Sequence, residues 1–196
     1  TVFSRRGAGG RRLAPVRRPY RRHVRGANQR LHQGDRTHAV APSAVRRLFQ
    51  PRLAFNFSGR YERALQDFDK AIALEPDFEQ AFRSKGDVYR RKGLIKRAIA
   101  EFDRAIAIKP DYATAFADRA LAYQALGMVE KALEDFDKTI ALLPDVGQHY
   151  FSRAQACERK GMLDAAVADL DRAIALEPTV ARYVAARGRV KARRSL

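Results

Sequence analysis

The chain has 196 residues and a formal net charge of +17 at pH 7, and 46% of its residues are hydrophobic, which is enough to build a core. Its single cysteine, Cys157, excludes a disulfide within the chain and any zinc site built from cysteines, and it fits a reducing compartment. No stretch has the roughly 18 consecutive apolar residues that a spanning helix needs, and arginines scattered through the N-terminus argue against a secretory signal. We therefore expect no membrane span and a cytoplasmic location.

Residues 1–52 form a strongly basic segment. They contain fourteen arginines, no lysine and one acid, Asp35, whereas residues 53–196 are nearly balanced in charge. Clusters of glycine, proline and arginine without a hydrophobic period predict that the segment is either disordered or non-native. It is an arm that binds nucleic acid or a membrane surface, an organelle transit peptide, or a translation of GC-rich sequence in the wrong frame or from a wrong start. The all-arginine usage favours the last interpretation.

A constant period begins at Leu53 and continues to the end of the chain. Its length is the spacing from Pro76 to Pro110, which we call the repeat step. It predicts a half unit over 53–78, full units over 79–112, 113–146 and 147–180, and a capping helix or truncated repeat over 181–196. The columns that recur at this step include Pro76, Pro110, Pro144 and Pro178; Gly59, Gly93, Gly127 and Gly161; Ala64, Ala98, Ala132 and Ala166; and Phe68, Phe102, Phe136 and Leu170.

Each full unit is predicted to contain two helices. In the unit 79–112 the first helix ends at Gly93, because glycine enters the left-handed conformation at little cost. The second runs from about Ile95 to Ile108, and Pro110 stops it because proline cannot donate the next backbone hydrogen bond. One helix pair cannot bury its apolar face alone, so we expect neighbouring units to stack and share a core.

These columns resemble the tetratricopeptide repeat, in tandem arrays of the bacterial type. The resemblance covers Leu53 to the C-terminus and departs mildly at Cys157, where the other units have Tyr89 and Tyr123, and at Thr139, which replaces an alanine. It implies an all-α fold, a right-handed superhelical solenoid of antiparallel helix pairs whose first helices line a concave groove. It also implies a non-catalytic scaffold that binds a peptide or protein segment in that groove.

The repeat step, applied along the first helices, gives the predicted lining of the groove. Its middle is apolar and its two ends are basic, which predicts a protein or peptide partner that is acidic and carries an apolar anchor. Phe151 on this face is either such an anchor site or a residue that packs on the adjacent first helix. The predicted groove residues are Arg83, Asp87, Arg90, Arg91, Ala117, Leu121, Ala125, Phe151, Gln155, Arg182 and Arg189.

The resemblance does not extend to one known ligand type of the family. Some members bind the C-terminal carboxylate of chaperones through a clamp of lysines and asparagines. In this chain both asparagine positions hold acids, Asp87 and Asp118, so we do not expect that activity. The residues at the clamp positions are Arg83, Asp87, Asp118, Gln148 and Ser152.

No residue set predicts catalysis, a metal or a cofactor. Acids recur on the second helices beside basic residues such as Lys70 and Arg104, so they are interpreted as a solvated outer face with local charge pairing. His149 is the only histidine of the repeat region, and Cys157 is expected to be a buried, structural thiol. The acids concerned are Asp67, Asp69, Glu101, Asp103, Asp135, Asp137, Asp169 and Asp171.

Two alternatives to the scaffold stay open. The first is a nucleic-acid-associated adaptor that uses the basic N-terminal arm; salt-dependent retention on RNA that is lost when residues 1–52 are deleted would support it. The second is a repeat fragment of a larger enzyme or regulator, since the chain starts at Thr1 rather than methionine and stops within a unit. Neither the partner nor the pathway is predicted by the sequence.

Overall fold

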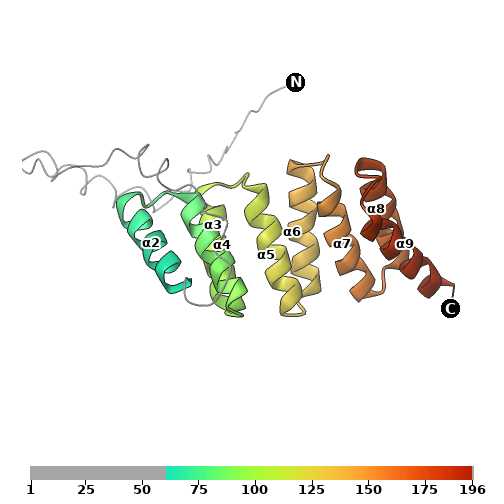
Figure 1. Ribbon diagram of the computed structural model, residues 1–196, viewed down its shortest axis with the longest axis horizontal. Helices are drawn as coiled ribbons and strands as arrows, with labels where there is room; N and C mark the ends of the chain where they lie inside the picture. Colours follow the sequence, from blue (N-terminus) through green and yellow to red (C-terminus); the bar gives the residue numbers. More distant parts are fainter. Residues whose placement is uncertain (1–60, 196) are drawn as a thin grey trace, which may run out of the picture. The chain divides into compact units, whose positions relative to one another are not determined.

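The computed structural model describes residues 61–195, so the expectations for 1–52 and for the start of the half unit lie outside the described residues. Within that range all regular secondary structure is helical, and no helix has the length and apolarity needed to cross a membrane. Figure 1 shows the helices side by side in chain order, the all-α arrangement that the sequence predicts. They are α2 (Tyr61–Leu74), α3 (Glu79–Arg91), α4 (Ile95–Ile108), α5 (Ala113–Ala125), α6 (Val129–Leu142), α7 (Gly147–Lys160), α8 (Leu163–Leu176) and α9 (Ala181–Arg194).

The turn inside each helix pair is made at a glycine. Gly93, Gly127 and Gly161 have φ values of 75°, 72° and 81°, in the left-handed region that side chains other than glycine rarely enter. These turns let the second helix fold back antiparallel to the first. The predicted bounds of the second helix in the first full unit are confirmed, because α4 begins at Ile95 and ends at Ile108.

Small residues allow the two helices of a pair to approach closely. On α4, Ala98 and Phe102 are fully buried, and a Cβ added at Gly86 of α3 would lie 2.5 Å from the Phe102 ring. Ala132 occupies the matching place on α6 and packs in one cluster with Ala120 of α5. Larger side chains at these positions would push the helices apart.

Contacts between helices identify the inner side of the solenoid. Each helix packs on the next one along the chain, and α3 also contacts α5, as α5 contacts α7. No comparable contact joins α4 to α6 or α6 to α8 within residues 61–195. Because the first helices approach each other and the second helices do not, the first helices lie on the concave side of the superhelix.

The interpretation of the second-helix acids as a solvated outer face is wrong for three of them. Glu101, Asp135 and Asp169 are buried, with exposed fractions of 8%, 2% and 6%. Asp135 accepts two hydrogen bonds of 2.7 Å from Arg119 on α5, whose third nitrogen donates to Asp103 on α4 at 2.6 Å. The expectation failed because each acid was compared with neighbours on its own helix, whereas its partner lies on a first helix.

The same arrangement recurs along the solenoid at the repeat step. A basic residue on a first helix bridges a buried acid on the second helix of its own unit and an exposed acid on the preceding second helix; the last of these residues, on α9, reaches only the preceding acid. We call these basic residues, Lys85, Arg119, Arg153 and Arg187, the basic ladder. Their partners are Asp69 and Glu101 for Lys85, Asp103 and Asp135 for Arg119, Asp137 and Asp169 for Arg153, and Asp171 for Arg187.

Candidate protein-binding site

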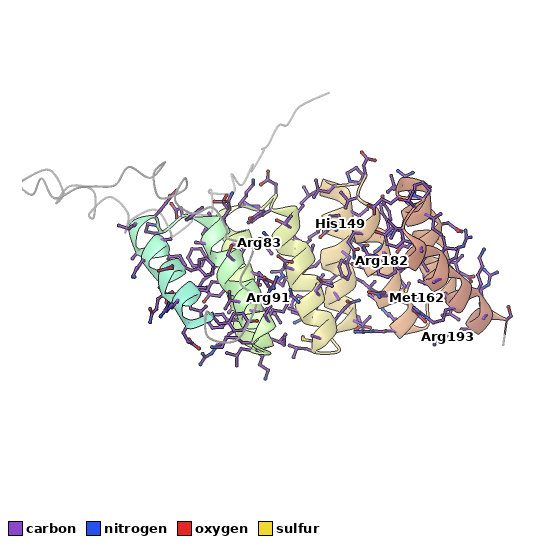
Figure 2. All side chains as sticks on the ribbon, viewed as in Figure 1. Arg83, Arg91, His149, Met162, Arg182 and Arg193 are labelled. Carbon is purple, nitrogen blue, oxygen red and sulfur yellow. The ribbon has the colours of Figure 1, made fainter. Side chains whose placement is uncertain are left out.

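The predicted groove residues lie on the first helices α3, α5, α7 and α9, and none of them is buried. Because the first helices form the concave side, the structure brings these residues onto one surface, which we call the first-helix face. Figure 2 labels Arg83 and Arg91 at its α3 end and Arg182 near its α9 end. The apolar middle is contributed by α5, where Leu121 is half-buried and Ala125 is exposed.

At the α3 end, arginines are paired with acids inside the chain. Arg83 donates to Asp118 of α5 at 2.7 Å, and Asp87 accepts hydrogen bonds from Arg90 at 2.6 Å and from Arg91 at 2.7 Å. Burial opposes ionisation of Asp87, but the two hydrogen bonds outweigh it and lower the pKa of that carboxyl. Burial raises the pKa of Asp118 despite the charge of Arg83. Three arginines therefore face two carboxylates, and little positive charge is free for a ligand.

The α9 end keeps more positive charge. Arg189 and Arg193 both donate to Glu158 of α7, at 3.1 and 2.8 Å, and the hydrogen bond from Arg189 is the main cause that lowers the pKa of Glu158. Arg182 donates to the neutral side-chain oxygen of Gln148. Three arginines thus face one carboxylate at this end. The sequence predicts that both ends are basic, and the structure adds that their arginines are paired with different numbers of carboxylates.

Phe151 packs on the adjacent first helix, which is one of the two alternatives that the sequence left open. Its ring centroid lies 5.0 Å from that of Tyr183 on α9. The guanidinium of Arg182 lies 5.5 Å from the centroid of Phe151 and 5.3 Å from that of Tyr183, in the range of cation–π contacts. Phe151 still retains partial exposure on the first-helix face. We call Phe151, Arg182 and Tyr183 the Phe151 cluster.

Cys157 and His149 lie in environments that favour a structural role. Cys157 is buried, and burial raises the pKa of its thiol, which disfavours the reactive thiolate. His149 is half-buried on α7, where burial lowers its pKa against the opposing charges of Asp118 and Glu177. Among residues 61–195, no group of three histidine, cysteine or acidic side chains is placed to hold a metal ion.

The basic ladder is the feature that sequence reasoning missed. Its members recur at the repeat step as Lys85, Arg119, Arg153 and Arg187, so the signal was present as a column. The buried acids Glu101, Asp135 and Asp169 form a second column, and a comparison between the two columns could have found the pairing. The ladder residues hold the first helices between second helices and so position the first-helix face.

Family models match most of the repeat region. A model of the TPR repeat matches residues 86–127, and models of the tetratricopeptide repeat match residues 117–181 and 53–78. The comparison with curated proteins found no match.

Solved structures of tetratricopeptide-repeat proteins are similar over most of the chain. The MamA protein is 30% identical, with a TM-score of 0.57 over 64% of this chain and 68% of that one. MamA residues 41 to the end from Desulfovibrio magneticus RS-1 is 19% identical, with a TM-score of 0.69 over 79% of this chain and 85% of that one. YrrB, described as a TPR protein with an unusual peptide-binding site, is 24% identical, with a TM-score of 0.61 over 69% and 70% of the two chains.

The repeat columns, the helix pairs and these matches together define the class of this protein. The chain belongs to the tetratricopeptide-repeat family. Members of this family are in general non-catalytic modules for protein interaction, and this chain is accordingly a protein-interaction scaffold with a superhelical fold.

Proposed function

We propose that the scaffold binds an acidic protein segment with an apolar anchor on its first-helix face, and that the segment docks at the end formed by α7 and α9. The observation that carries this proposal is the Phe151 cluster. Phe151 offers a partly exposed aromatic surface, and Arg182 above it donates to a neutral amide rather than to a carboxylate. An acidic group of the ligand gains a partner there without displacing another carboxylate.

The α3 end is a poorer candidate for the same segment. An incoming carboxylate would compete with Asp118 for Arg83 and with Asp87 for Arg90 and Arg91. The same two acids occupy the asparagine positions of the chaperone-binding clamp, so a C-terminal carboxylate would meet like charge. One structural neighbour, the first TPR of Spaghetti, is bound to an HSP90 peptide; it is 22% identical, with a TM-score of 0.59 over 60% of this chain and 94% of that one.

The test uses an array of peptides in which one leucine, phenylalanine or methionine is flanked by aspartates or glutamates. The full chain should bind acidic members of the array and leave the versions with lysine flanks unbound. For the best peptide, Phe151→Ala should weaken binding by about tenfold or more, because anchor contacts carry most of the energy of an interface. Arg182→Gln should reduce the association rate and its dependence on salt, because exposed charges act mainly through steering.

Arg194→Gln is the matched control. Arg194 is also an exposed arginine of α9, but it pairs with Asp164 of α8 at 3.0 Å and is not on the first-helix face. The Arg194→Gln variant removes the same charge from the same helix as Arg182→Gln. Because it does so away from the first-helix face, it should leave peptide binding unchanged. If Phe151→Ala and Arg182→Gln bind the peptide as tightly as the parent chain, the first-helix face is not the binding surface.

A further inference from the structure

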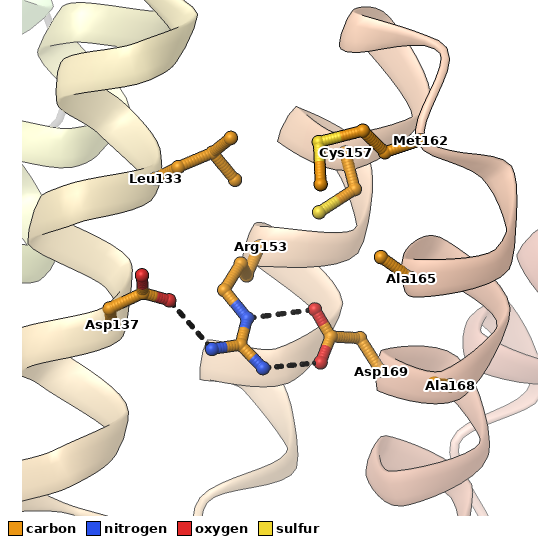
Figure 3. A pocket seen from close by; sticks show the side chains of 8 residues that line it. All are labelled: Leu133, Asp137, Arg153, Cys157, Met162, Ala165, Ala168 and Asp169. Carbon is orange, nitrogen blue, oxygen red and sulfur yellow. Dashed lines mark hydrogen bonds and ion pairs between the residues drawn. The ribbon is translucent and has the colours of Figure 1, made fainter.

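A cleft of about 320 Å³ lies between α6, α7 and α8, and Figure 3 shows the side chains around it. Its apolar part is formed by Leu133 of α6, Cys157 of α7 and Ala165 of α8, with Met162 at one side. Arg153 lies across its other part. None of these residues belongs to the first-helix face, so the cleft is separate from the site of the proposed function.

In the two preceding units, an aromatic ring occupies the place of Cys157. Tyr123 stands one repeat step before Cys157 and packs in a cluster that includes Leu133. The ring of Tyr123 also lies 5.7 Å from the guanidinium of Arg119 and 5.6 Å from the ammonium of Lys131. Arg153 stands one repeat step after Arg119, and Ala165 stands one repeat step after Lys131. Both Arg153 and Ala165 line the cleft.

The first full unit repeats this arrangement. The ring of Tyr89 lies 5.9 Å from Lys85, the member of the basic ladder in that unit, and 5.9 Å from Arg97. Two units of the same chain therefore place a tyrosine ring between a ladder cation on the first helix and a second cation on the following helix.

The unit 147–180 lacks both the ring and the second cation but keeps the ladder residue. Cys157 replaces the tyrosine, and Ala165 replaces the cation on the second helix. Arg153 nevertheless stays in its ladder position, because it donates to Asp169 at 2.9 and 2.6 Å and to Asp137 at 2.7 Å, as the dashed lines of Figure 3 mark. The cleft is thus a space for an aromatic ring that this unit does not fill.

We propose that this cleft binds an aromatic side chain, tyrosine or phenylalanine, presented by a second protein partner. The ring would lie against Leu133 and Cys157, with the guanidinium of Arg153 at its face. Met162 is 43% exposed, and its flexible, polarisable thioether is suited to closing over a ring edge. Asp137 and Ala168 at the rim are exposed, so the main chain of the partner's residue can remain outside.

The experiment titrates two probes, 4-methylphenol and N-acetyl-tyrosinamide, into the ¹⁵N-labelled full chain and follows amide chemical shifts. Both probes should give saturable shifts centred on Cys157, Ala165 and Ala168. Cys157→Tyr supplies the missing ring from within the chain, so it should weaken binding of both probes by about tenfold or more, because a ring already packed in the cleft leaves no room for a second. Ala165→Leu fills the cleft from α8 and should weaken binding of both probes in the same way. It keeps the test available if Cys157→Tyr does not fold.

The outcomes separate the proposal from its rivals and from the proposed function. Absence of saturable shifts in the parent chain, or equal binding in Cys157→Tyr and Ala165→Leu, would overturn the site. Binding of 4-methylphenol without N-acetyl-tyrosinamide would mean that the cleft takes free aromatic molecules only and would overturn the protein source. Phe151→Ala should bind both probes like the parent chain, since Phe151 lies outside the cleft. Failure of the peptide test on the first-helix face therefore leaves this result unchanged.

Discussion

Basic and acidic side chains pair in two regions of the solenoid, with different surroundings. In the basic ladder, the side chains of Arg119 and Asp135 are 15% and 3% exposed. On the first-helix face, Arg189 and Arg193 are 57% and 52% exposed where they meet Glu158, whose side chain is 14% exposed. A pair withdrawn from water must stay together, because either charge alone would be buried without a partner. An exposed pair can exchange its partner for water or for a ligand at little cost.

This difference assigns the two regions different tasks. The basic ladder holds each first helix between two second helices, whereas Arg189 and Arg193 at the α9 end of the first-helix face remain more than half exposed. Residue type alone does not distinguish them, since both use arginine with a carboxylate. Burial distinguishes the pairs that hold the fold from the more exposed pairs at the α9 end of the first-helix face.

Breaking the basic ladder should have the largest effect. Asp135→Ala leaves Arg119 without its buried partner and should lower the free energy of unfolding by about 3–5 kcal/mol, the usual result of removing one member of a buried pair. Asp103→Ala removes the exposed partner of the same arginine and should cost less than about 1 kcal/mol. Urea titrations of both variants measure the difference. Equal losses of unfolding free energy would mean that burial of the Asp135 carboxylate does not strengthen its pairing with Arg119.

Separating the helices should have the next largest effect. The ladder can form only if α5, α6 and α7 lie close together, and fully buried Ala132 permits that approach. Ala132→Leu should destabilise the chain by about 1–3 kcal/mol through overpacking. Ala141→Leu, at an exposed position of the same helix, is the matched control and should change little. An unchanged urea midpoint for Ala132→Leu would mean that Ala132 does not lie at a close contact between helices.

The exposed pairs should give the smallest effect and a pH dependence. The pKa of Glu158 is lowered in the folded chain from an ordinary value of 4.5. Its contribution is therefore present above about pH 4.5 and is lost as the pH falls through the lower folded value. Glu158→Gln should be less stable than the parent chain at pH 7 by less than about 1 kcal/mol, and the two should converge as the pH falls through the folded pKa of Glu158. A gap in melting temperature that persists once this carboxyl is protonated would assign the effect to packing instead.

The fold could be predicted from the sequence because local features repeat. Gly93 and its counterparts mark the turns, and Pro110 follows the end of α4, so the helices could be located without knowing what they contact. The position of Phe151 on a first helix followed from the repeat step. The repeat step therefore predicts which positions recur along the first helices.

The pairing of side chains within the first-helix face could not be predicted in this way. Arg83 meets Asp118, and Arg189 meets Glu158, each on a neighbouring first helix. Neither separation along the chain equals the repeat step, because each contact depends on how neighbouring first helices cross. For the same reason the sequence left open whether Phe151 contacts the adjacent first helix, where it meets Tyr183. Periodicity predicts which residues share a face, and the crossing of helices decides which of them touch.

Because the ladder contacts overlap, neighbouring units of the solenoid should unfold together. Helix α6 is held twice, through Asp135 to Arg119 on α5 and through Asp137 to Arg153 on α7. A unit cannot leave the array without also opening contacts that stabilise the unit beside it. The buried cluster around Phe136 also includes Ala156 of the next unit, so neighbouring units share apolar burial as well as a ladder contact. Coupling between neighbours favours unfolding of a one-dimensional array in a single cooperative transition. Amide hydrogens in α4, α6 and α8 should accordingly exchange through one common opening event rather than unit by unit.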